Sequence, residues 1–147
     1  MLEWLLVHFC IGVAGTWLAR RYAIRQSLID QPGERRSHSV ATPRGGGIAI
    51  VISLLVAAAA IGVRQPAQAP LMLAFGIALL MVAGIGWVDD HRPLSPWLRL
   101  GVHVLASGLF AGVVGDLYDS VWLGIAAFAA TLVLTNVWNF MDGINGL

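Results

Sequence analysis

The chain has 147 residues, of which 58% are hydrophobic and only 12% are charged, whereas a soluble domain is about half apolar and about a quarter charged. This composition excludes an ordinary soluble domain and favours a membrane protein. The formal net charge of +1 gives no support for nucleic acid binding, and the single cysteine, Cys10, excludes a disulfide within the chain.

Five apolar stretches follow one another, and a helix needs about 20 residues to cross a bilayer. The first runs into Arg20 and Arg21 without a cleavage signal, so we interpret it as an uncleaved span. The fourth is short and contains glycine. The sequence therefore predicts an all-α, polytopic integral membrane protein with about five transmembrane helices in one membrane domain, residues 1–147. The predicted spans cover approximately residues 2–19, 45–63, 71–88, 100–115 and 121–138.

The arginines orient these spans. Six of the nine lie in residues 20–44 and two more lie in residues 89–99. Because basic residues accumulate on the cytoplasmic side, both loops are predicted to be cytoplasmic and the N-terminus to lie outside. Four carboxylates then share the cytoplasmic face, although only arginines were used to orient the chain. They belong to Asp30, Asp89, Asp90 and Asp142.

Small residues in the spans predict where neighbouring helices approach closely, since glycine allows tight helix contacts in membranes. The candidates for such contacts are Gly84, Gly86, Gly108 and Gly112.

Two adjacent carboxylates, Asp89 and Asp90, close the third stretch. Mg²⁺ binds through one or two carboxylates while it keeps several waters and accepts substrate phosphates. Neighbouring carboxylates also raise each other's proton affinity, so one of them could act as a base. A plain acidic loop at a helix end is the alternative interpretation, because exposed acids are common.

Asn136, Asn139 and Asp142 recur at spacings of three, which brings them near one side of the last helix end. Amides in an apolar run need hydrogen-bond partners. Together with the carboxylate they could hold a sugar nucleotide or the water shell of a metal. The alternative is hydrogen bonding between helices, which polar residues in membranes also form.

Arg44 precedes three glycines at the predicted start of the second span. The spacing is not that of a P-loop, but N–H groups at a helix start can bind an anion, and Arg44 can add charge to a phosphate contact. A flexible helix entry is the alternative. His38 and His91 are predicted in loops, where a single histidine has many roles. His103 lies inside a span, where it is expected to satisfy a hydrogen bond facing the bundle.

Taken in order, these elements resemble the polyprenyl-phosphate N-acetylhexosamine-1-phosphate transferases, which are of glycosyltransferase family 4 type. The resemblance covers essentially the whole chain, and the run Asn-Phe-Met-Asp-Gly-Ile-Asn-Gly is most similar to the branch that initiates O-antigen synthesis. It rests on Asp30-x-Pro32-x-x-Arg35-Arg36-x-His38, Pro43-Arg44-Gly45-Gly46, Asp89-Asp90 and Asn136-x-x-Asn139-x-x-Asp142-Gly143.

The resemblance implies transfer of an N-acetylhexosamine 1-phosphate from a UDP-sugar to undecaprenyl phosphate, with release of UMP. The reaction would start O-antigen or a related cell-envelope polysaccharide. Asp89 and Asp90 would be catalytic, and with Asp142 they would bind Mg²⁺, or Mn²⁺ in its place. Asn145 stands where many relatives have aspartate, so it can form a hydrogen bond but cannot act as a base. The residues expected to bind substrate are Asn136, Asn139, Asp142, Asn145, Arg35, Arg36, His38 and Arg44.

The resemblance also implies a location and partners. We expect a multi-pass protein of the bacterial inner (cytoplasmic) membrane that works in the lipid bilayer without nucleic acid, and a homodimer is compatible with this expectation. Members of the family are larger bundles of about ten or eleven helices. We therefore expect the chain to be an N-terminal portion that is inactive alone.

Two other classes of protein stay open as alternatives. One is part of a membrane transporter, where broken helices and polar residues in mid-membrane are common. The other is a membrane assembly subunit without catalytic activity. The acids at span ends, on one face, favour the transferase over the transporter.

Overall fold

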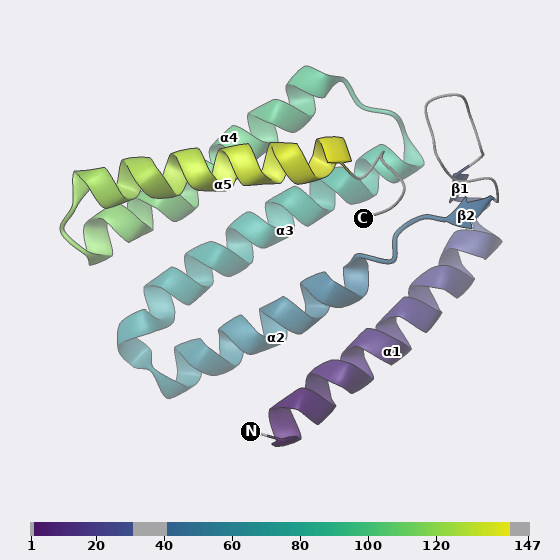
Figure 1. Ribbon diagram of the computed structural model, residues 1–147, viewed down its shortest axis with the longest axis horizontal. Coiled ribbons are helices and arrows are strands. Elements are labelled where there is room, and N and C mark those ends of the chain that lie inside the picture. The colour runs from purple at the N-terminus through teal and green to yellow at the C-terminus, as the bar shows by residue number, and fades with distance from the viewer. Residues whose placement is uncertain (1, 31–40, 142–147) are drawn as a thin grey trace.

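The computed structural model describes residues 2–30 and 41–141, and this part of the chain folds into five α-helices (Figure 1). The predicted all-α fold is therefore confirmed. A short 3-10 helix, η1, precedes α3, and two short antiparallel strands pair Ile29 with Pro43. The elements are α1 (Leu2–Arg25), β1 (Ile29–Asp30), β2 (Thr42–Pro43), α2 (Ile48–Arg64), η1 (Pro66–Gln68), α3 (Ala69–His91), α4 (Pro96–Leu117) and α5 (Val121–Met141).

The helices run up and down, and each packs against the next one along the chain. Figure 1 shows that α1, α3 and α5 end on the same side of the molecule on which α2 and α4 begin. The two strands lie at this side as well. We call it the site end, because Asp89 and Asp90, the predicted catalytic acids, lie there at the end of α3.

Three helical segments are long and apolar enough to cross a membrane in the described part of the chain, namely Leu2–Arg25, Pro66–His91 and Pro96–Leu117. The apolar helices Ile48–Arg64 and Val121–Val137 are shorter. Helix α4 is longer than the predicted fourth stretch. Its start is set by Ser95, whose hydroxyl accepts the Leu98 N–H at 3.2 Å as an N-cap, with proline in the first turn.

The packed interior consists of small residues. Every buried apolar residue that the structure describes is an alanine, whereas many large aliphatic and aromatic side chains face outward. Leu105 is 64% exposed and Trp122 is 80% exposed. Helices in lipid associate through small residues, because lipid tails solvate leucine as well as another helix does. This arrangement is that of a membrane protein.

The glycine contacts differ from those predicted. Within the described residues, a Cβ added at any of the four candidates would meet nothing within 4 Å, so the prediction of close approach there is wrong. The candidates were Gly84, Gly86, Gly108 and Gly112. Close approach occurs instead at Gly15, against Ala49 of α2, and between Gly115 and Gly124. Glycine content alone does not show which side of a helix meets its neighbour.

Candidate functional site

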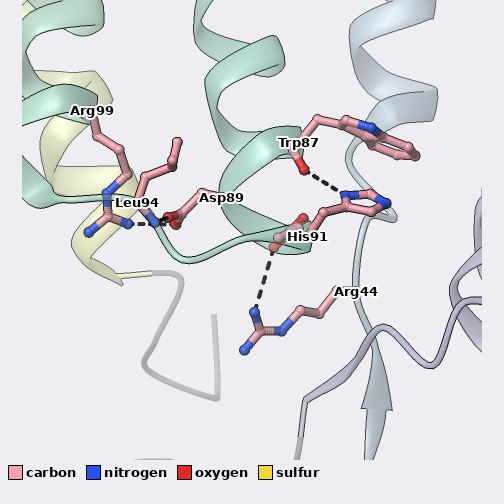
Figure 2. A network of polar contacts seen from close by, with 7 residues as sticks. Arg44, Trp87, Asp89, His91, Leu94 and Arg99 are labelled. Atoms are coloured by element: carbon pink, nitrogen blue, oxygen red, sulfur yellow. Dashed lines mark hydrogen bonds and ion pairs between the residues drawn. The ribbon is translucent and has the colours of Figure 1, made fainter.

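The last turn of α3 carries both predicted catalytic acids, Asp89 and Asp90, at the site end. Figure 2 shows Asp89 there with its partners. Helix α3 continues to His91, so Asp89 and Asp90 are helical residues and not part of a loop. Consecutive residues of a helix point in different directions, and the two carboxylates accordingly meet different partners. Asp89 faces the connection to α4, and Asp90 faces the segment that leads into α2.

Both oxygens of Asp89 accept hydrogen bonds. Oδ1 accepts the backbone N–H of Leu94 at 2.8 Å, and Oδ2 accepts from Nη1 of Arg99 at 2.9 Å. The side chains of Asp89 and Arg99 are 25% and 28% exposed. Charged hydrogen bonds of this length are among the stronger ones in proteins. Asp89 therefore fastens the turn between α3 and α4.

Arg99 is a partner that the sequence interpretation missed. The signal was present, because Ser95 followed by proline is typical of a helix start and would have placed Arg99 in the first turn of α4. The Nε–H of Arg99 is buried and has no hydrogen-bond partner among the described residues. Buried donors are nearly always satisfied, so a further acceptor is expected beside Arg99.

Asp90 lies near Arg44, which the sequence predicts to contact phosphate. Oδ1 of Asp90 and Nη1 of Arg44 are 3.8 Å apart, an ion-pair distance that is longer than a hydrogen bond. The backbone of Arg44 is held by its N–H, which donates to the Leu28 carbonyl at 3.0 Å. Gly45 follows with a φ of 87°, a conformation that favours glycine. Figure 2 shows Arg44 reaching toward the end of α3.

His91 joins α3 to α1. Its Nδ1 lies 2.8 Å from the Trp87 carbonyl oxygen, and its Nε2 lies 3.0 Å from the Tyr22 hydroxyl. Because a carbonyl only accepts, Nδ1 donates there, and Nε2 of the neutral ring accepts from Tyr22. Tyr22 also stacks on Trp87, with ring centroids 5.2 Å apart. The prediction that His91 lies in a loop is therefore wrong, because it closes α3 and contacts a second helix.

The side-chain amide of Asn136 forms one hydrogen bond within its own helix and one to α4. Its Oδ1 lies 3.3 Å from Nδ1 of His103, and its Nδ2 donates to the Leu132 carbonyl at 2.8 Å. The hydrogen bond predicted for His103 is confirmed. Hydrogen bonding between helices was the alternative to substrate binding for Asn136, and the bond to His103 is of that kind. The predictions for Arg35, Arg36, His38, Asp142 and Asn145, and for the Asn139 side chain, lie outside what the structure describes.

Two of the three residues predicted to hold Mg²⁺, Asp89 and Asp90, lie in the described part of the chain. Carboxylate oxygens are the ligands that Mg²⁺ prefers, and each oxygen of Asp89 keeps a second lone pair beyond its hydrogen bond. No group of three acidic, histidine or cysteine residues that could hold a metal occurs in residues 2–30 and 41–141. The third predicted ligand, Asp142, lies outside that part. The donor chemistry fits the ion, and the binding itself stays a prediction.

A cavity of about 480 Å³ lies at the opposite end of α4 and α5. It is lined by glycines of both helices, by Asp116 and Asp119, and by apolar side chains that include Phe128. Of the predicted site residues that the structure describes, none lines this cavity. The described candidates Asp89, Asp90 and Arg44 lie at the site end, away from this cavity.

Comparison with known proteins identifies relatives. The sequence model described as glycosyl transferase family 4 matches residues 72–147, just over half of the chain. A probable undecaprenyl-phosphate N-acetylglucosaminyl 1-phosphate transferase of Bacillus subtilis is 30% identical over 90% of this chain and 39% of its own length. An undecaprenyl-phosphate alpha-N-acetylglucosaminyl 1-phosphate transferase of Yersinia pestis is 25% identical over 97% of this chain and 42% of its own length.

A mycobacterial relative shows the same partial coverage. A decaprenyl-phosphate N-acetylglucosaminephosphotransferase of Mycobacterium leprae is 26% identical over 97% of this chain and 39% of its own length. The chain thus spans about two fifths of the curated relatives that it matches. No solved structure matches it.

Proposed function

The chain belongs to glycosyl transferase family 4, and from that premise we propose that it forms part of a polyprenyl-phosphate sugar-1-phosphate transferase. The donor is a UDP-N-acetylhexosamine and the acceptor is undecaprenyl phosphate. The observation that carries the proposal is the end of α3, where Asp89 and Asp90 lie between Arg99 and Arg44. Relatives that carry this activity in their names align with nearly all of the chain.

The proposed reaction is a phosphoryl transfer. A phosphate oxygen of the lipid forms a bond to the phosphorus that carries the sugar, and the bond from that phosphorus to the UMP oxygen breaks. Such reactions require chiefly positioning of the reactants and neutralisation of negative charge. The guanidinium groups of Arg44 and Arg99 supply positive charge beside the two acids. The Nε–H of Arg99, which has no partner among the described residues, is a donor that a phosphate oxygen would satisfy.

We propose Asp89, Asp90 and Asp142 as the residues that hold Mg²⁺, or Mn²⁺ in its place. When bound, the ion neutralises phosphate charge and orients the diphosphate. Asp89 and Asp90 position the lipid phosphate, and one of them accepts its proton. The side chains of Asn139, Asn145, Arg35, Arg36 and His38 remain proposed contacts to the sugar nucleotide.

The proposal places the site end at the cytoplasmic face of a bacterial inner membrane, with the N-terminus outside. The basis for this orientation is the arginines, because Arg44, Arg92 and Arg99 all lie at the site end. The product would enter O-antigen or a related cell-envelope polysaccharide.

The test uses membranes that contain the chain, both as 147 residues and in the longest form that its gene encodes. UMP release is measured with undecaprenyl phosphate, Mg²⁺ and a series of UDP-N-acetylhexosamines. We expect release from the longest form, none from the 147-residue chain, and none after Asp89→Asn, Asp90→Asn or chelation by EDTA. Asp116→Asn, at the opposite end of the bundle, is the matched control and should retain activity. Absence of release from a folded longest form with every UDP-sugar would refute the proposal.

A further inference from the structure

Helix α4 carries two polar side chains on successive turns, and they reach different neighbours. Arg99 donates to Asp89 of α3 at 2.9 Å, and His103 lies 3.3 Å from Asn136 of α5. The α4 helix therefore contacts both helices that bring predicted site residues to the site end. The proposed function uses Asp89 and Arg99 but assigns no task to His103.

His103 is only 4% exposed, which makes it one of two buried polar residues in the described part of the chain. The orientation of its bond follows from Asn136. Since Nδ2 of Asn136 donates to the Leu132 carbonyl, Oδ1 is the atom that faces His103, and this oxygen accepts a hydrogen bond from the Nδ1–H of His103. Both ends of the Asn136 amide are thus used within the protein.

We infer that His103 is a positioning residue, which holds the last turns of α5 against α4 through Asn136; the inference rests on the proposed function. Asn136 is then the anchor of the Asn-x-x-Asn-x-x-Asp run and not a contact to substrate. The bond sits three residues before Asn139 and six before Asp142. A shift of the anchor would displace the end of α5 relative to the end of α3, and displacements near 1 Å can reduce turnover about a hundredfold.

Matched substitutions at His103 separate the hydrogen bond from simple packing. The side-chain nitrogen of asparagine can occupy the place of Nδ1, whereas the nitrogen of glutamine reaches the place of Nε2. Glutamine and leucine are closer to histidine in volume than asparagine is. If His103 acts only by packing, His103→Gln and His103→Leu should therefore preserve the α4–α5 geometry better than His103→Asn. A positioning role through Nδ1 predicts the opposite order.

The first measurement reports geometry and needs no activity. Spin labels are attached to the 147-residue chain at Trp97→Cys and Val137→Cys, two exposed positions on α4 and α5, after Cys10→Ser. The distance between the labels is recorded in lipid nanodiscs. We expect one narrow distribution for the parent and for His103→Asn, and a broadened or shifted one for His103→Gln and His103→Leu. Unchanged distances in the last two variants would overturn the inference.

The second measurement is UMP release by the longest form encoded by the gene. We expect kcat to fall at least about tenfold in His103→Gln and His103→Leu and to stay within about threefold of the parent in His103→Asn. Equal activity of all variants, or loss in His103→Asn as large as in His103→Leu, would overturn the inference. If the parent releases no UMP with any UDP-sugar, the proposed function fails, and the distance measurement still decides whether His103 positions α5.

Discussion

Removal of the Arg99 side chain tests how much the end of α3 depends on one ion pair. Nη1 of Arg99 and Oδ2 of Asp89 are 2.9 Å apart. At that separation Coulomb's law gives about 1.4 kcal/mol in water and about 6 kcal/mol at an effective dielectric constant of about 20. Desolvation and the ordering of two side chains offset most of this energy. Exposed pairs contribute about 0–1 kcal/mol, and loss of one partner of a buried pair costs about 3–5 kcal/mol.

The pair lies between these limits, because its side chains are 25% and 28% exposed. We expect a coupling free energy of about 1–2 kcal/mol between Arg99 and Asp89. The single variants should differ. Arg99→Met leaves Asp89 with the Leu94 N–H, which still satisfies one oxygen. Asp89→Asn turns an amide NH₂ toward one of two donors, so it should destabilise the protein at least as much.

The assay is a double-mutant cycle with Arg99→Met, Asp89→Asn and the combined variant. The free energy of unfolding is measured by SDS titration in mixed micelles with circular dichroism. Arg92→Met is the control, because it removes the same charge from an exposed position in the same connection. We expect it to change stability by less than about 0.5 kcal/mol. A coupling below about 0.3 kcal/mol would show that the pair does not hold the turn, and the reasoning from its burial would be wrong.

Two further predictions concern the close contacts between helices. Gly15→Ala should destabilise the bundle by about 1–3 kcal/mol relative to Gly12→Ala. The Cβ added at Gly15 would lie 2.8 Å from a side chain of α2, whereas the Cβ added at Gly12 would meet nothing within 4 Å. Gly124→Ala should likewise cost about 1 kcal/mol more than Gly112→Ala, since its Cβ would meet a backbone carbonyl of α4 at 3.3 Å. Both comparisons use the same SDS titration, and each control carries the same change in helix propensity. Equal stabilities within a pair would mean that the two helices are not in the contact described.

The sequence predicted those features that depend on one segment alone, namely which segments are helical and which residues lie at their ends. Hydrophobic composition predicts the five helices, and arginine counts predict which of their ends share a face. Asp89 and Asp90 could be placed at the end of the third helix because the apolar run stops there. The start of α4 could also have been predicted from the sequence, since Ser95 and the following proline are a local signal for a helix start.

The rest depends on how the helices are rotated against one another. Nothing in a single segment pairs Asp89 with Arg99, His91 with Tyr22, or His103 with Asn136. Those contacts join residues 10, 69 and 33 positions apart. In the described part of the chain, a Cβ added at any of the four glycines predicted as contacts would meet nothing within 4 Å, while one added at Gly15 or Gly124 would meet neighbouring atoms closely. These helices are apolar on most of their sides, so hydrophobicity predicts that a helix forms, but only tertiary packing decides which of its sides meets a neighbour.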